Sequence, residues 1–110
     1  MAMNTFDNII EELIKFRDER NWKQFHTPEN LAKSIVIEAG ELLECFQWNP
    51  TNAKLKDVEE ELADILIYSF YLANYYNLDI KEIINKKIKI NESKYPISKS
   101  KNNCFKYDEF

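Results

Sequence analysis

The chain has 110 residues, 45% hydrophobic and 31% charged, with a single Gly. This length fits one domain, and the shortage of Gly excludes glycine-rich phosphate loops and a sheet of tight hairpins. The net charge of −4 divides into an acidic part, residues 1–80 with seven basic and fifteen acidic side chains, and a basic part, residues 81–106 with eight Lys and two Glu. A chain without a broad cationic face is a poor partner for nucleic acid.

Apolar residues repeat at helical spacing from about Thr5 to Arg20, which predicts the first helix. Thr27 and Pro28 predict the start of the second, because a hydroxyl caps the helix and Pro needs no N–H donor at the first helical position. This second helix is expected to run to about Trp48.

The third helix is expected from about Ala53 to Tyr76. Asp79 then caps a fourth helix, which ends at Pro96. The prediction is therefore an all-α bundle of four main helices in one domain, residues 1–96, followed by a C-terminal tail, residues 97–110. The aromatic side chains of the tail that could dock on the domain are Phe105, Tyr107 and Phe110.

The first residues lack the features of a signal peptide, and no apolar run approaches the length of a membrane span. Cys45 and Cys104 fit no metal-binding or redox spacing. We expect a cytoplasmic protein that does not associate with membranes.

Four carboxylates form two pairs, one on the second predicted helix and one on the third. The members of each pair are three residues apart, which places them on one helix face. These are Glu38 and Glu41 on the second helix, and Glu61 and Asp64 on the third. No Lys or Arg occurs between positions 34 and 53 or between 57 and 76. If the helices are antiparallel neighbours, the carboxylates converge and repel, and a divalent cation would relieve the repulsion. The alternative is two solvated acidic faces.

Oxygen-only ligands suit Mg²⁺ or Mn²⁺. A di-iron or zinc site is disfavoured because the sole histidine, His26, is expected in a loop. Gly40 lies between the acids of the second helix, where Gly costs about 1 kcal/mol relative to Ala. We therefore expect a close approach of backbone or ligand at Gly40.

The pattern E-x-x-E, spacer, E-x-x-D resembles the signature of the MazG-like all-α nucleoside triphosphate pyrophosphohydrolases. Flanking segments are similar to the branch of that family that hydrolyses dCTP, and the resemblance covers about residues 6–96 in the same order. These segments are Arg20–His26, Glu38–Leu42, Phe46–Trp48, Asp64–Tyr68, Lys87–Asn91 and Lys94–Pro96.

The resemblance implies Mg²⁺-dependent hydrolysis of a nucleoside triphosphate, dCTP or a modified dCTP above all, to the monophosphate and pyrophosphate, with Mn²⁺ as a possible substitute. By matching positions, the catalytic metal ligands would be Glu38, Glu41, Glu61 and Asp64. The carboxylate that activates water stays open between these ligands and two acids at the edge of the cluster, Glu44 and Glu60.

The resemblance also places Trp22, His26 and Trp48 in the pocket for the base, where aromatic stacking contributes about 1–3 kcal/mol per base. For the tryptophans the alternative is core or interface packing, and for His26 an exposed loop position. Tyr68 follows Asp64 by four residues and could reach sugar or phosphate, or be an ordinary buried tyrosine.

On the fourth helix, four residues form a possible clamp for phosphate and sugar: Lys87, Asn91, Lys94 and Tyr95. Lys86 and Lys89 lie off that face and are expected in solvent.

The resemblance implies a homodimer or homotetramer, a dimer of dimers, and the wide apolar stripes agree with a core completed by a second copy. Two alternatives remain. One is the same fold acting on another nucleotide, dUTP-like or phosphoribosyl-ATP-like. The other is a non-catalytic helical interaction protein, which the complete set of four acids disfavours.

Overall fold

The computed structural model describes residues 5–109, and within this range every regular element is helical, as predicted from the sequence. None of these helices combines the length and the apolar character that a membrane span requires. The elements are α1 (Thr5–Glu19), the 3₁₀ helix η1 (Trp22–Phe25), α2 (Pro28–Glu44), α3 (Leu55–Tyr75), α4 (Ile80–Lys94), α5 (Ile97–Ser100) and the 3₁₀ helix η2 (Tyr107–Glu109).

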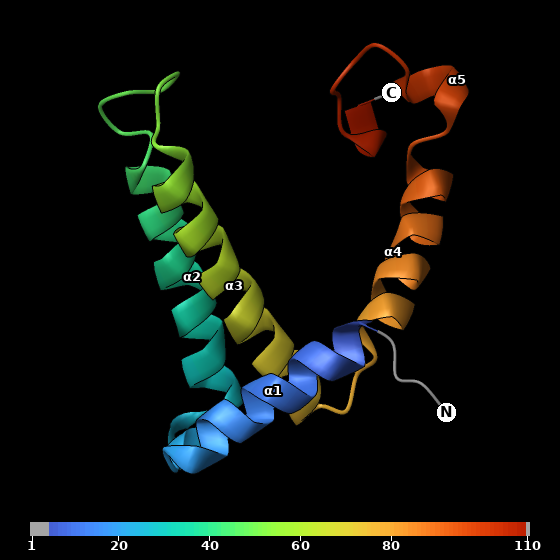
Figure 1. Ribbon diagram of the computed structural model, residues 1–110. Helices are drawn as coiled ribbons and strands as arrows, with labels where there is room; N and C mark the ends of the chain where they lie inside the picture. Colours follow the sequence, from blue (N-terminus) through green and yellow to red (C-terminus); the bar gives the residue numbers. More distant parts are fainter. Residues whose placement is uncertain (1–4, 110) are drawn as a thin grey trace. The chain divides into compact units, whose positions relative to one another are not determined.

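The chain separates into two compact units, Met1–Leu78 and Asp79–Phe110, which are described in turn. In the first unit α2 and α3 lie side by side as an antiparallel pair, joined by a loop over residues 45–54 (Figure 1). The predicted start of α2 is confirmed. The backbone amide of Asn30 donates to the Thr27 hydroxyl at 3.2 Å, and Pro28 lies in the first turn.

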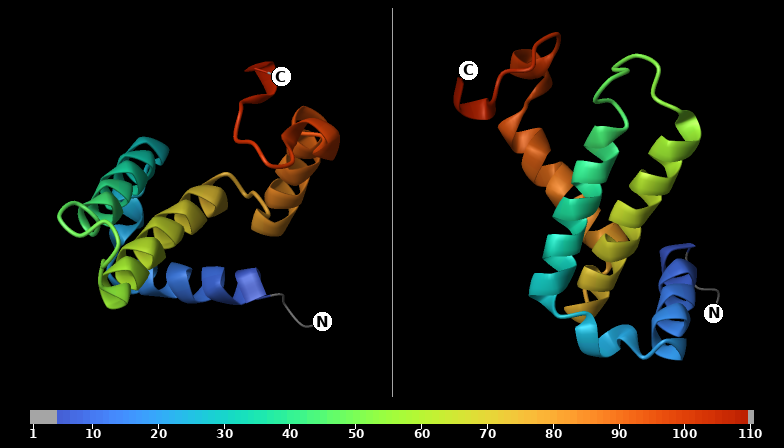
Figure 2. Two further views of the ribbon diagram at one scale, coloured as in Figure 1. Left: turned by 90° about the horizontal axis from the view of Figure 1, so that it is seen from above. Right: turned by 90° about the vertical axis from the view of Figure 1, so that its left-hand side faces the viewer.

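Helix α1 crosses the end of the α2–α3 pair that lies away from the loop (Figures 1 and 2). The Tyr71 hydroxyl of α3 donates to the Leu13 carbonyl of α1 at 2.7 Å, and the rings of Phe6 and Phe70 meet edge to face at 6.0 Å. The core of this unit is small: Leu31 is 2% exposed, and Tyr71 and Ala73 are each 6% exposed.

The predicted end of α2 near Trp48 is wrong by four residues. The amides of Cys45, Phe46 and Gln47 each donate to the carbonyl three residues earlier, so the chain tightens into turns after Glu44. Pro50 disfavours helical conformation at Asn49 and so sets only an outer limit, and the change to hydrogen bonds over three residues ends the α-helix before that limit. Trp48 consequently lies in the loop rather than on the helix.

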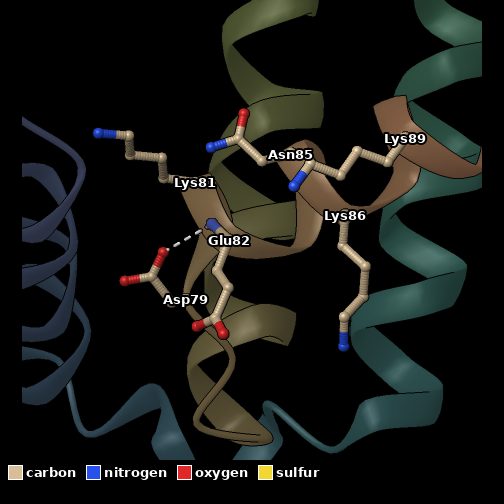
Figure 3. Close-up of a pocket in the computed structure, with 6 residues that line it drawn as sticks. All are labelled: Asp79, Lys81, Glu82, Asn85, Lys86 and Lys89. Atoms are coloured by element: carbon tan, nitrogen blue, oxygen red, sulfur yellow. Dashed lines mark hydrogen bonds between the residues drawn. The ribbon is translucent and has the colours of Figure 1, made fainter. Parts of the chain in front are cut away.

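In the second unit the Glu82 amide donates to the Asp79 carboxylate at 2.8 Å, which confirms the predicted cap of α4. An open pocket of about 560 Å³ lies along the first turns of α4, and Figure 3 shows the side chains that line it. The pocket is lined by Asp79, Lys81, Glu82, Asn85, Lys86 and Lys89. Lys86 and Lys89 are exposed, as the sequence predicts.

After α4 the chain forms two short helical turns, α5 and η2. The Tyr107 ring meets the Tyr95 ring edge to face at 6.1 Å, and the Lys94 ammonium lies 4.8 Å from the Tyr107 ring centre. Phe105 is 59% exposed. Phe110 lies outside the described residues.

Candidate active site

The carboxylates of α2 and α3 converge where the two helices face each other. Glu38, Glu61 and Asp64 each place one oxygen within 4.8 Å of the others, and all three side chains are half-buried. Glu41 is exposed and adjoins this cluster, and its carboxyl group contributes to the raised pKa of both Glu38 and Glu61. The four acids singled out in the sequence therefore lie together.

The cluster is electrostatically unfavourable as it stands. Burial, together with a hydrogen bond and repulsion from Glu41, raises the pKa of Glu38 to about 7. The hydrogen bond with Glu41 and then burial raise the pKa of Glu61. Glu38 Oε2 and Glu61 Oε2 are buried without a hydrogen-bond partner. Buried unpartnered oxygens and raised pKa values are what a divalent cation would correct, so these residues fit a metal site.

Two other acids were candidates for activating water. Glu44 and Glu60 are both exposed, and neither belongs to the group of oxygens that converge. No backbone of the described chain approaches Gly40, because a Cβ built there meets no atom within 4 Å, so that part of the expectation is wrong. The close approach of a ligand at Gly40 stays a prediction. Gly40 lies on an open face of α2.

An aromatic pocket of about 270 Å³ adjoins the cluster, and Asp64 belongs to both. Phe16 and Trp22 meet edge to face at 5.8 Å, and the Arg20 guanidinium lies 3.6 Å from the centre of the Phe16 ring. The full lining is Leu13, Phe16, Trp22, His26, Asp64, Ile67, Tyr68 and Tyr71.

Three residues that sequence reasoning proposed for substrate binding, Trp22, His26 and Tyr68, thus line one pocket. Burial, followed by the charges of Glu38, Asp64 and Glu41, raises the pKa of Tyr68, so its hydroxyl stays protonated near neutral pH. Sequence reasoning missed Phe16 and Tyr71. The signal for Tyr71 was its spacing, because Asp64, Tyr68 and Tyr71 follow one helix face at i, i+4 and i+7.

Trp48 does not join this pocket within the described chain. It lies in the loop between α2 and α3 and is 82% exposed. This loop lies at the opposite end of the α2–α3 pair from η1, which carries Trp22 (Figure 1).

The proposed phosphate clamp belongs to the second compact unit. Lys87 and Asn91 are exposed, whereas Lys94 and Tyr95 are half-buried and contact Tyr107. These two contacts with Tyr107 lie inside that unit.

Comparison with known sequences agrees with these features. The MazG-like family profile matches residues 33–110. The chain is 35% identical over 114 residues to dCTP pyrophosphatase 1 of Bos taurus, an alignment that covers 96% of this chain and 68% of that protein. It is also 35% identical to dCTP pyrophosphatase 1 of Homo sapiens, covering 96% of this chain and 67% of that protein.

Comparison with solved structures gives the same relationship. A crystal structure of a pyrophosphatase from Archaeoglobus fulgidus superimposes with a TM-score of 0.80 and 38% sequence identity. The match covers 87% of this chain and 96% of that one.

Proposed function

Since the chain belongs to the MazG-like family and is a nucleoside triphosphate pyrophosphohydrolase, we propose that its substrate is a dNTP, with dCTP or a modified dCTP preferred, and that its role is to clear such nucleotides from the pool. The observation that carries this proposal is the position of Asp64, which belongs both to the carboxylate cluster and to the aromatic pocket. A base in the pocket would have its triphosphate close to a cation held by the cluster.

Glu38, Glu61 and Asp64 would hold Mg²⁺, with Glu41 as a fourth ligand and Mn²⁺ as a substitute. The support is the oxygen-only donor set and the two buried carboxylate oxygens that lack a partner. Bound there, Mg²⁺ would offset phosphate charge and acidify a water molecule. One of its carboxylate ligands would also orient the attacking water, because Glu44 and Glu60 lie outside the cluster.

The aromatic side chains would bind the base. Trp22 and Phe16 offer ring surface at one wall of the pocket, and Tyr68 offers a hydroxyl donor beside Asp64. We also propose that Lys87, Asn91, Lys94 and Tyr95 contact sugar and phosphate, as the resemblance of α4 to the family implies. The chemistry then needs little more than positioning and electrostatic stabilisation.

We further propose that a second copy of the chain completes the pocket, in a homodimer or a dimer of dimers. Helix α2 has 17 residues and therefore a length of roughly 25 Å, so Trp48 is too far from Trp22 to reach the same base within one copy. A second support is an exposed apolar stripe on α2, where Val36 is 71% and Leu43 is 72% exposed. Stripes of this kind mark protein interfaces.

The test is pyrophosphate release from a panel of canonical and 5-modified dNTPs, with Mg²⁺ and with chelator. We expect chelator-sensitive release that is highest with a cytosine nucleotide. Release that peaks on another base would refute the base assignment and keep the chemistry. No release from any nucleotide, with the protein folded, would refute the proposed activity and favour the interaction-protein alternative.

The metal ligands are tested by paired variants on neighbouring residues. Glu61→Gln removes a carboxylate from the cluster, and Glu60→Gln makes the same change at an exposed position outside it. We expect Glu61→Gln to reduce kcat/KM on the order of 100-fold or more, since the metal supplies several kcal/mol of transition-state stabilisation. Glu60→Gln should keep near-normal activity. Equal losses in the two variants, or unchanged turnover in Glu61→Gln, would contradict the assignment.

A further inference from the structure

Arg17 is the buried charged residue of the described chain, with 9% of its surface exposed. Its Nε donates to the Asp18 carboxylate at 2.9 Å, and the Asp18 side chain is 54% exposed. A guanidinium has five N–H donors, and this contact uses one of them. The other guanidinium nitrogens are not among the fully buried atoms that lack a partner, so they stay accessible to a further acceptor beside the side chain.

The Arg17 side chain borders a second pocket of about 380 Å³, which lies wholly within Met1–Leu78. The pocket combines two cations with two carboxamides, and no carboxylate lines it. Its lining is Arg17, Lys23, His26, Leu31, Tyr71, Asn74, Tyr75 and Asn77. Burial and then the charge of Arg17 lower the pKa of His26, so near neutral pH the positive charge of the pocket comes from Arg17 and Lys23.

We propose that this pocket binds a phosphate-type oxyanion, with Arg17 and Lys23 as its cationic ligands. Donors come from the Arg17 fork, the Lys23 ammonium and the amides of Asn74 and Asn77, which is more than the two oxygens of a carboxylate can satisfy. The site is distinct from the acidic cluster, because none of the cluster carboxylates lines it.

The two pockets share a wall. His26 and Tyr71 line both, and their rings lie 4.7 Å apart. Tyr71 is held in place by its hydrogen bond to the Leu13 carbonyl. An anion beside His26 therefore acts on a side chain of the pocket proposed for the base, and we expect it to change the KM for the nucleotide. This second effect rests on the proposed function, whereas the binding itself does not.

His26 is the single histidine of the chain, so its ring resonances in a ¹H–¹³C NMR spectrum report on this pocket without ambiguity. The experiment titrates metal-free protein with inorganic phosphate at fixed pH and fixed ionic strength. Metal is removed with a chelating resin, because a dissolved polycarboxylate chelator would compete for the same cations. We expect a saturable shift of the His26 resonances.

Lys23→Gln is the decisive variant, since Lys23 is exposed and its replacement should leave the fold intact. We expect it to weaken phosphate binding about tenfold, the effect of losing one charge-assisted hydrogen bond. Arg17→Gln should abolish the saturable shift. Lys33→Gln is the matched control, because Lys33 pairs with Glu29 on α2 and lies outside the pocket lining; it should bind phosphate normally.

A shift that does not saturate, or one of equal affinity in Lys23→Gln and wild type, would overturn the proposal. A titration with pyrophosphate in place of phosphate distinguishes two sources of the bound anion, the reaction product and free phosphate. Tighter binding of pyrophosphate identifies the reaction product, and tighter binding of phosphate identifies the free ion. Because the NMR measurement needs no turnover, loss of the proposed activity would leave this test unaffected.

Discussion

In the metal-free protein the surroundings of the Glu38 side chain disfavour its negative charge. Its Oε2 atom is buried without a partner, and its pKa is raised to about 7 by burial and by the neighbouring acids. Deprotonating it therefore costs folding free energy. Its folded-state pKa lies above the unfolded value of 4.5, so the folded protein binds more protons between these pH values and loses stability as the pH rises from about 4.5 through 7.

We expect Glu38→Gln to raise the stability of the metal-free protein at pH 7.5 and to leave it nearly unchanged at pH 4.5. Because Glu38 is half-exposed, solvent screening reduces the gain to about 1 kcal/mol, or roughly 4–8 °C in Tm for a domain of this size. Thermal unfolding at both pH values measures it. A lower Tm for the variant at pH 7.5 would show that the carboxylate is not strained.

Substitution of Trp22 tests whether its ring stacks on the base in the proposed pocket. We expect Trp22→Leu to raise the KM for the nucleotide about tenfold or more with a smaller change in kcat, because stacking contributes about 1–3 kcal/mol per base. Steady-state kinetics measure both. Phe25→Leu is the control, since Phe25 belongs to the same 3₁₀ helix, is 60% exposed and lies outside the pocket lining. Equal effects of the two substitutions would argue against a stacking role for Trp22.

The site residues that could be predicted from the sequence are those whose helical spacing determines the helix face on which they lie. The pairs spaced three apart indicated which acids share a face, and the structure brings all four together. Arg17 was not predicted as a site residue, because an arginine near the end of a polar helix normally extends into solvent. Its burial depends on how α1 meets α3 and the chain after it, which no local pattern specifies.

At the scale of elements, the N-terminus of α2 controls the position of η1 and therefore of Trp22 and His26. The Asn30 amide donates to the Thr27 hydroxyl, and the Asn30 side chain donates to the Phe25 carbonyl at 3.0 Å. One turn of α2 thus ties the helix start to the segment that lines the pocket.

We expect Thr27→Ala to reduce the free energy of unfolding by about 1 kcal/mol, the usual cost of an N-cap hydroxyl. Urea denaturation measures it, and the slope should be unchanged because the core is the same. Thr27→Ser keeps the oxygen and should retain the stability. A loss in Thr27→Ser equal to that in Thr27→Ala would assign the effect to the methyl group instead of the cap.

Helix starts followed the sequence more closely than helix ends. The caps Thr27 and Asp79 are each encoded in one side chain that accepts a backbone hydrogen bond. Pro50 limits α2 only at Asn49, whereas the helix ends at Glu44, where the hydrogen bonds change from a spacing of four residues to a spacing of three. Short-range sequence patterns do not predict the residue at which this change occurs.

Within residues 5–78 the first unit buries three apolar side chains and leaves an apolar stripe exposed on α2. Gly40 lies on this stripe between Val36 and Leu43, and a Cβ there would meet open space. The missing side chain lowers the surface at that point, which suits close approach of another helix.

We expect Val36→Lys to weaken the proposed homo-oligomer at least about tenfold, since a charge placed in an apolar interface is left unpaired. Sedimentation equilibrium measures the association. Asn8→Lys introduces the same side chain at an exposed polar position of α1 and should associate normally. A wild-type chain that remains monomeric at all concentrations would contradict the proposed assembly.

The separation of Trp22 from Trp48 has a kinetic consequence. If each working pocket needs one tryptophan from each of two chains, the number of pockets is set by an association equilibrium and not by the number of folded chains. Turnover per milligram would then fall on dilution, and below the dissociation constant the total rate would rise with the square of enzyme concentration. Doubling the number of chains would in that case raise the rate of nucleotide removal about fourfold at low expression and about twofold once the chains are fully associated. The level of synthesis itself would then control the reaction.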